Sequence, residues 1–413
     1  MVRKLRGNAK GCLVYEPLFI IPYSLFITYA SVYMLALGLD ETKIGIITSL
    51  GLFVQIIASI FSGYLTDRLG RRSALWIFDV VSWSVATLIW AISQNFWFFV
   101  VAAVVNSFQK VPHIAWNCLL VEDTEPKDRS YVFTVLQFIS IVGGLFAPLG
   151  GLLVSHFTLV PAVRIMYIIA CISMTIMVIA RHFATHETEI GIRKKQEVSE
   201  IKFKEAAAEY IDGIKSIYKN RPLLLIFIVY ILFNFQITMQ QTYLSIYLVD
   251  RLQISDTMIG IFPAVSSVCM LVLLIYVVPR LNERYNNRYI MLGFGLSILA
   301  SLLIIVSAPK AIAIVILSTI LSACGLLFSS PYLESTVANS IDDDRRANLT
   351  SILQVFVLVF ISPAGIIGGL TYKLDPRIPF LLIILSLLIS ISVMIVLSRK
   401  TSDENHQQVS YNS

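Results

Sequence analysis

Apolar residues form twelve long runs that are separated by short polar segments. The runs cover residues 12–37, 43–65, 73–93, 96–121, 130–156, 161–182, 222–249, 257–280, 289–307, 311–338, 347–372 and 378–398. A helix needs about 20 apolar residues to cross roughly 30 Å of hydrocarbon, and each run is about that long or longer. Within a bilayer only helices and closed barrels satisfy every backbone polar group. The pattern therefore predicts an all-α membrane protein with twelve transmembrane helices.

One polar segment is much longer than the others and divides the chain. Residues 183–221 separate two sets of six spans, so we expect an N-terminal bundle over 1–182, a linker over 183–221, a C-terminal bundle over 222–398 and a tail over 399–413. Apolar residues recur at helical spacing in the linker, which predicts an amphipathic helix along the membrane surface. They are Phe203, Ala207, Tyr210, Ile211, Ile214, Ile217 and Tyr218.

The two halves repeat each other in sequence. Residues 28–33 (TYASVY) recur at 242–247 (TYLSIY), 44–46 (IGI) recur at 259–261, and 150–152 (GGL) recur at 368–370. Weaker matches elsewhere keep the same order, and the offset rises only from 214 to 218. The repetition predicts two pseudo-symmetric six-helix bundles.

Charge distribution fixes the expected orientation. Only 14% of the residues are charged and the net charge is +6. With both termini inside, 25 of the 32 Lys and Arg residues fall in inner segments and 6 in outer segments, while Lys110 lies within a span. The positive-inside rule then places both termini in the cytoplasm and the chain in the cytoplasmic membrane. Basic residues facing anionic lipid account for the pI of about 9.0, so we expect no nucleic-acid partner.

The remaining composition offers little for cofactor chemistry. The basic N-terminus is followed by an apolar stretch that is too long for a signal-peptide core, so we expect an uncleaved first span. Five cysteines lie far apart, in or beside apolar runs, without the spacing of a metal or redox site. We expect no metal and no cofactor.

The segment between the second and third runs is short and strongly cationic. It reads Gly63-Tyr64-Leu65-Thr66-Asp67-Arg68-Leu69-Gly70-Arg71-Arg72, in which the glycines suit a sharp turn and the arginines must lie at a membrane surface. This G-x-x-x-D-R-x-G-R-R pattern resembles the signature loop between spans 2 and 3 of the major facilitator superfamily of secondary transporters. The resemblance covers all twelve spans and implies a solute site between two halves that work by alternating access.

The resemblance also implies that this loop is a conformational latch. In the family, the loop holds span 2 to span 11, and its arginines reach acids at the inner end of span 4, which here are Glu122 and Asp123. The residues that match the motif are Gly63, Asp67, Arg68, Gly70, Arg71 and Arg72.

Ionisable residues within spans are candidates for function, because a charge in hydrocarbon is costly. Lys110 lies near the middle of span 4 and forms a polar stripe with Asn106, His113 and Asn117, at helical spacing. Such a stripe must face the bundle interior, where it could bind an anionic or hydroxyl-rich solute. The alternative is a structural pair with an acid on another helix. Pro112 interrupts the hydrogen bonding of the same helix and predicts a bend.

Three carboxyl groups are candidates for proton coupling. Glu16 precedes Pro17 in span 1, Asp79 lies about seven residues into span 3, and Glu334 lies in the inner part of span 10. The alternative for Glu16 and Glu334 is a hydrated carboxylate or one paired with an arginine, and Glu334 is favoured slightly for its depth. For Asp79, pairing with the cations of the signature loop is the favoured interpretation.

The resemblance implies that spans 1, 4, 7 and 10 line the central cavity. Tyr23 and Phe26 in span 1, with Asn234 and Gln241 in span 7, then become candidate solute contacts. The alternative for the aromatic residues is packing within the bundle.

These observations favour a secondary active transporter, working as a monomer, that moves a small organic solute with protons as the coupling ion. Proton-coupled efflux of an amphipathic compound is the first choice. The aromatic span 1 supports it, and so does a degenerate form of the glycine-proline motif that drug antiporters carry in span 5, at residues 143–151. The alternative is uptake of a sugar or organic anion that uses Lys110. An enzyme is not expected, because we find no nucleophile-base pair, and a sensor would need an added soluble domain.

Overall fold

The computed structural model describes residues 5–197, 215–281, 285–341 and 346–411, and helices account for most of them. Twelve helical segments in this part of the chain are long and apolar enough to cross a membrane. The predicted all-α membrane protein with twelve spans is confirmed. The predicted amphipathic helix falls mostly on residues 198–214, which lie outside the described residues.

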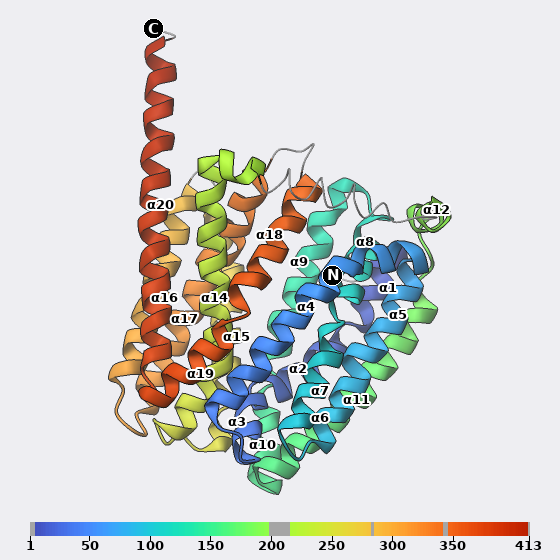
Figure 1. Ribbon diagram of the computed structural model, residues 1–413, viewed down its shortest axis with the longest axis vertical. Helices are drawn as coiled ribbons and strands as arrows, with labels where there is room; N and C mark the ends of the chain where they lie inside the picture. The colour runs from blue at the N-terminus through green and yellow to red at the C-terminus, as the bar shows by residue number, and fades with distance from the viewer. Residues whose placement is uncertain (1–4, 198–214, 282–284, 342–345, 412–413) are drawn as a thin grey trace.

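The first six spans form one bundle (Figure 1). Their elements are α1 (Gly7–Tyr15), α2 (Pro17–Ile27), α3 (Ala30–Ala36), α4 (Glu41–Leu69), α5 (Arg71–Asp79), η2 (Val80–Val85), α6 (Ala86–Ile92), α7 (Phe96–Ser107), α8 (Lys110–Val121), α9 (Pro126–Gly144), α10 (Pro148–Phe157) and α11 (Leu159–Ala184). The short helix α12 (Glu189–Glu197) follows span 6.

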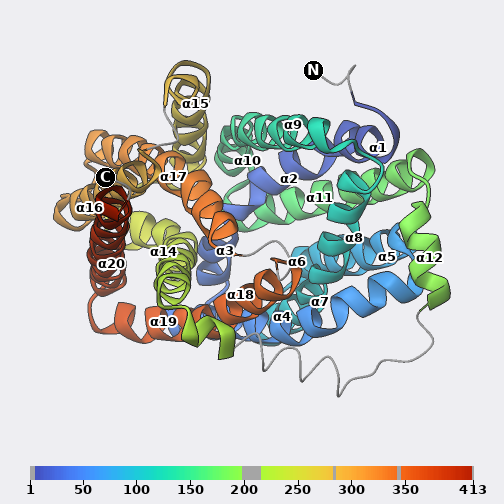
Figure 2. The ribbon, with the colours of Figure 1, turned by 90° about the horizontal axis from the view of Figure 1, so that it is seen from above.

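The last six spans form the second bundle, which lies beside the first in both views (Figures 1 and 2). Their elements are α14 (Arg221–Asp250), η3 (Asp256–Met258), α15 (Ile261–Tyr276), η4 (Val278–Arg280), α16 (Asn286–Val306), α17 (Ile312–Asn339), α18 (Arg346–Ile361), α19 (Ala364–Leu374) and α20 (Ile378–Tyr411). The bundles meet chiefly where α4 packs along α18 and α19, and where α9 and α10 pack on α15 and η3.

Spans 1, 3 and 4 are not continuous α-helices. Span 1 breaks before Pro17, because proline has no N–H to donate, and again after α2, while span 3 passes through the π-helix η2. Span 4 breaks between α7 and α8 at Phe108 and Gln109. The cause is Pro112, which cannot donate to Phe108, so the Phe108 carbonyl accepts from Val111 at 3.0 Å. The structure therefore interrupts span 4 one turn before Pro112, where the sequence predicts a bend.

The signature segment is mostly helical. We expected both of its glycines to serve a turn, but α4 continues through Gly63 to Leu69 and α5 begins at Arg71. Only Gly70 turns, with φ of 89° in the region that favours glycine. Spans 2 and 3 are therefore joined by a single non-helical residue.

A duplicated contact between tyrosine and glycine joins the halves at one end of the molecule. We call this the loop end, since it holds the connections at 37–40, 251–255, 307–311 and 375–377; the opposite end, near Gly70 and residue 411, is the terminal end. Tyr29 lies against Gly150 and Gly151 of its own half, and its hydroxyl accepts from the Gly260 N–H of the other half at 3.1 Å.

The second half repeats this arrangement with the matching residues of the sequence repeat. Tyr243 lies against Gly368, donates to the Gly365 carbonyl at 2.5 Å and contacts Gly45 of the first half. A Cβ at Gly45 would lie 2.6 Å from the Tyr243 hydroxyl, and a Cβ at Gly260 would lie 2.6 Å from the Ala147 carbonyl oxygen. The two halves therefore approach each other closely at the loop end because these positions have no side chain.

Candidate functional site

Two predicted carboxylates come together on one arginine. Arg181, in the last turn of α11, donates to Glu16 at 2.7 Å and to Asp79 at 3.3 Å. The three side chains are 5–7% exposed and come from spans 1, 3 and 6. Glu16 occupies the break before Pro17, and Asp79 ends α5. We call these three residues the buried triad. Asp79 therefore does not pair with the signature-loop cations as we had favoured, because Arg181 is the cation that reaches it.

The triad lies against a cavity of about 350 Å³ in the N-terminal half. We call it the triad cavity. It is lined by Glu16, Phe19, Tyr23, Leu75, Asp79, Trp83, Gln109, Pro112, His113, Trp116, Met177 and Arg181. The Phe19 and Trp83 rings meet edge to face at 4.7 Å, and Tyr23 stacks on Phe19 at 5.6 Å. The cavity combines two buried carboxylates with an aromatic wall.

Trp116 adds an unused polar group to this wall. Its indole N–H is buried and has no hydrogen-bond partner in the described part of the chain. A buried donor without a partner is destabilising. A ligand acceptor in the triad cavity could satisfy it.

The residues of the polar stripe in span 4 do not share one environment. Asn106 donates to the Ser82 carbonyl in η2 at 2.8 Å, so it faces span 3. His113 is exposed, lines the triad cavity and lies 3.3 Å from Asn117 through its Nε2. Lys110 begins α8 and is half-buried. Among the described residues no carboxylate pairs with Lys110, and its side chain does not line the triad cavity.

A second cavity of about 350 Å³ lies between the halves, and we call it the central cavity. Tyr23 and Gln241 line it, and Tyr23 also lines the triad cavity. Phe26 is 2% exposed and packs on Tyr167 at 4.8 Å, while Asn234 donates to the Tyr230 carbonyl at 2.8 Å. The structure thus brings two of the four predicted solute contacts to this cavity, whereas Phe26 and Asn234 do not line it.

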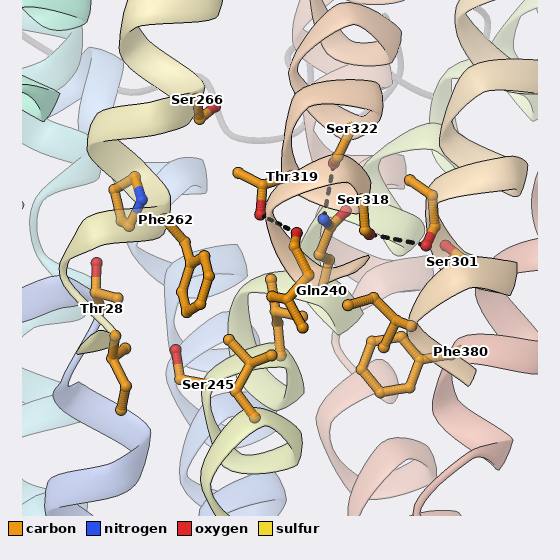
Figure 3. Close-up of a pocket in the computed structure, with 17 residues that line it drawn as sticks. Thr28, Gln240, Ser245, Phe262, Ser266, Ser301, Ser318, Thr319, Ser322 and Phe380 are labelled. Carbon is orange, nitrogen blue, oxygen red and sulfur yellow. Dashed lines mark hydrogen bonds between the residues drawn. The ribbon is translucent and has the colours of Figure 1, made fainter. Parts of the chain in front are cut away.

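A third cavity, of about 200 Å³, opens among hydroxyl groups of the C-terminal half (Figure 3). We call it the hydroxyl pocket. Its polar lining residues are Thr28, Gln240, Ser245, Ser266, Ser301, Ser318, Thr319 and Ser322. It shares Thr28, Gln240 and Ser322 with the central cavity. Sequence reasoning missed this pocket, because serine and threonine are common in apolar helices and carry no distinctive spacing.

Glu334 stands apart from the buried triad. It lies in α17, its side chain is exposed, and its carboxylate accepts from Ser330 at 3.1 Å. It does not line any of the three cavities. No group of three metal-binding side chains gathers within the described residues.

Three of the predicted latch residues, Asp67, Arg71 and Glu122, form an ion cluster at the terminal end. Arg71 contacts Asp67 at 2.5 Å and Glu122 at 3.3 Å. Asp123 instead accepts from Asn8 at 2.6 Å and lies 3.1 Å from His186. Arg68 donates to Tyr64. Gly63 has open space around it.

Two residues of this region were missed by sequence reasoning. Glu187, just after span 6, accepts from the backbone N–H groups of Arg71 and Arg72 at 2.9 and 3.1 Å, and so caps α5. The sequence places Arg181 at the very end of the predicted span 6, so the charge distribution assigns it to the inner cationic segments. The structure extends α11 to Ala184 and buries Arg181.

Comparison with known proteins agrees with this architecture. An uncharacterized MFS-type transporter, YqjV, of Bacillus subtilis strain 168 is 31% identical over 131 residues, which are 31% of this chain and 32% of that protein. The multidrug resistance protein MdtG of Salmonella dublin is 25% identical over 204 residues, 47% of each chain. The matches therefore span about a third and about half the length of these curated relatives.

Solved structures share the fold over nearly the whole length. The nucleoside transporter NupG superimposes with a TM-score of 0.67 at 14% identity, covering 95% of this chain and 99% of that one. A POT family transporter in complex with a thioalcohol-conjugated peptide gives 0.68 at 15% identity, covering 96% of both chains. The sequence profile of the Major Facilitator Superfamily matches residues 18–362 and, in a second match, residues 226–411. With twelve spans in two bundles and a profile match over most of its length, this chain belongs to the Major Facilitator Superfamily and is a secondary transporter, not an enzyme.

Proposed function

We propose that this transporter exports an amphipathic organic cation in exchange for protons. The observation that carries the proposal is the buried triad at the edge of an aromatic cavity. When all three groups are charged, Glu16, Asp79 and Arg181 carry one net negative charge. A buried site with one uncompensated negative charge favours a positive ligand.

The same charge gives a route to exchange. Either a proton on a carboxylate or the cationic nitrogen of a solute can neutralise the triad, and both cannot do so at once. Binding of one therefore favours release of the other, which is the requirement for antiport. Phe19, Tyr23 and Trp83 offer ring faces to the apolar body of the solute, and aromatic faces attract organic cations.

Access to the site would alternate by rocking of the two bundles. We propose that the terminal end faces the cytoplasm, as the distribution of Lys and Arg indicates. The cluster of Asp67, Arg71 and Glu122 would then act as a latch on the cytoplasmic side.

Two further observations bear on the choice of solute. The partial similarity to a multidrug resistance protein supports export of an amphipathic compound. The alternative, uptake of a sugar or organic anion at Lys110, has less support because Lys110 lies outside the three cavities. Glu334 has less support as the proton carrier, because its carboxylate is exposed and has no arginine within the described residues.

The test is transport of ethidium by purified protein in proteoliposomes with an imposed pH gradient. We expect the gradient to drive ethidium movement, and we expect Glu16→Gln and Asp79→Asn each to reduce it by roughly 10- to 100-fold, the factor that one charge-assisted hydrogen bond provides. Glu189→Gln, an exposed carboxylate in α12, is the matched control.

Two results would contradict the proposal. Ethidium movement that ignores the pH gradient would remove protons as the coupling ion. Loss of pH-driven movement in Glu334→Gln, with normal activity in Glu16→Gln and Asp79→Asn, would assign proton coupling to Glu334 in span 10 and not to the buried triad.

A further inference from the structure

The hydroxyl pocket and the central cavity differ in charge from the triad cavity. No Asp, Glu, Lys, Arg or His from the described residues lines either of them. Their polar groups are hydroxyls and amides, set among apolar walls such as Phe262 and Phe380 (Figure 3). A charged group in the hydroxyl pocket would lose its hydration without meeting an opposite charge, which is costly. The pocket therefore suits a neutral group.

The hydrogen bonds inside the hydroxyl pocket decide what kind of neutral group fits. Ser318 donates its proton to the Ala300 carbonyl at 2.8 Å, Thr319 to the Val315 carbonyl at 2.8 Å, and Ser301 to the Ser297 carbonyl at 3.0 Å. A hydroxyl has one proton but two lone pairs. These three groups can therefore only accept a hydrogen bond from a ligand.

Gln240 has the remaining fixed polar group. Its Oε1 accepts from Gln236 at 2.6 Å and its Nε2 donates to Ser322 at 2.9 Å, so one N–H is left for a ligand. Thr28, Ser245 and Ser266 have no hydrogen-bond partner within the described residues and can act either way. The pocket as a whole offers more acceptors than donors.

We propose that the hydroxyl pocket binds a neutral hydrogen-bond-donating group of the transported solute, such as an alcohol or an amide N–H. The pocket of about 200 Å³ has room for roughly seven waters at ~30 Å³ each, which is the size of a short polar arm or a small ring. This proposal rests on the proposed function, in which the cationic end of the same solute occupies the triad cavity.

The route between the two ends passes Tyr23. Tyr23 lines both the triad cavity and the central cavity, and Thr28 and Gln240 line both the central cavity and the hydroxyl pocket. A solute that joins an aromatic ring and a protonated alkylamine to a hydroxyl-bearing chain would therefore meet a suitable lining along its whole length. A solute with an acidic or phosphorylated arm would not.

The test compares two probes that differ in one hydroxyl. The probes are 1-naphthylmethylamine with an N-3-hydroxypropyl chain and the same amine with an N-propyl chain, and the measurement is the Kd of each for the purified full-length protein. We expect the hydroxypropyl probe to bind about 3- to 10-fold tighter, the factor that one neutral hydrogen bond supplies. In Ser318→Ala and Thr319→Val the ratio should fall towards about one, with the propyl probe little changed.

Ser329→Ala is the matched control. Ser329 also lies in α17 and donates to the carbonyl four residues before it, at 2.7 Å, but it lines none of the three cavities. It should leave the ratio unchanged. Equal binding of the two probes by the unaltered protein, or a ratio that survives Ser318→Ala and Thr319→Val, would overturn the proposal. So would failure of both probes to bind. The proposed function is tested separately, by pH-driven transport and by the Glu16, Asp79 and Glu334 variants.

Discussion

The residue that most determines the character of this site is Arg181. A guanidinium between two carboxylates allows Glu16 and Asp79 to stay buried, although a buried charge without a partner is strongly destabilising. Its Nε has no partner in the described part of the chain, so Arg181 is itself incompletely satisfied. The carboxylates could be predicted from the sequence because each lies well within an apolar run. Arg181 could not, because it lies at the inner end of the predicted span 6, where a cation is expected to face the cytoplasm and not to be buried.

Removing the arginine should separate its structural role from its transport role. Arg181→Met leaves Glu16 and Asp79 buried without a cation, and breaking a buried pair in this way costs about 3–5 kcal/mol. We expect a lower thermal unfolding temperature for the purified protein. In the triple variant Glu16→Gln, Asp79→Asn, Arg181→Met no charge remains in the buried triad, so we expect stability to recover while pH-driven transport stays absent.

Arg251→Met, which changes an exposed arginine, is the control for this series. An unfolding temperature for Arg181→Met equal to that of the unaltered protein would show that the pairing seen in the structure does not stabilise the fold. Recovery of pH-driven transport in the triple variant would show that the triad is not the proton site.

At the scale of elements, the interruptions in spans 1, 3 and 4 place the site. Two of these interruptions lie at or near a proline, Pro17 or Pro112, so the sequence indicates them. Another, the π-helix η2 in span 3, begins directly after Asp79 and contains neither proline nor glycine, so no local signal predicts it. Within η2 the Ser82 carbonyl accepts from Asn106 of span 4, a tertiary contact that the local sequence does not indicate. π-helical turns are frequent at functional sites.

The duplicated tyrosine-glycine contact should control how far the loop end closes. In Gly260→Ala, the added Cβ would lie 2.6 Å from the Ala147 carbonyl oxygen and 3.1 Å from the Tyr29 hydroxyl, so the halves must separate there. We expect spin labels at positions 43 and 373, whose lysines are exposed on opposite halves at this end, to show a longer distance in the variant. Pulsed dipolar spectroscopy measures that distance.

Gly295→Ala provides the comparison, because a Cβ at Gly295 would meet no atom within 4 Å. It should leave the distance between the labels as it is in the unaltered protein. An unchanged distance in Gly260→Ala would mean that small shifts of Tyr29 or Ala147 absorb the added methyl group, and that the contact does not set the closure of the loop end.

At the scale of the whole molecule, the sequence repeat predicts the two-bundle architecture. It does not predict which half holds the charged residues and which holds the hydroxyl pocket. The repeat is kept where the halves meet, since Tyr29 and Gly45 have their counterparts in Tyr243 and Gly260. It is lost at the triad. By the same offsets, Glu16 corresponds to Tyr230 and Asp79 to Phe294. The charged cavity and the neutral hydroxyl pocket therefore fall in different halves, and only the packed structure shows how side chains from separate spans line each one.

The orientation of the molecule in the membrane decides which side the tyrosine-glycine contacts close. If the terminal end faces the cytoplasm, then the tyrosine-glycine contacts close the outer side, and solute reaches the triad from within the cell, as export requires. We expect Lys373→Cys, at the loop end, to react with a membrane-impermeant maleimide on intact cells. Lys195→Cys, in α12, should react only after the cells are permeabilised. Both lysines are exposed, so access to the reagent is set by the membrane.

The background for this labelling is a variant without the five native cysteines, of which Cys12 is buried and the others are half-buried. It must first retain pH-driven transport. Labelling of Lys195→Cys on intact cells would place the ion cluster of Arg71 on the outer face, against the charge distribution. The tyrosine-glycine contacts would then close the cytoplasmic side, and a solute in the triad cavity would have entered from outside. The same experiment therefore tests both the topology and the direction of transport that depends on it.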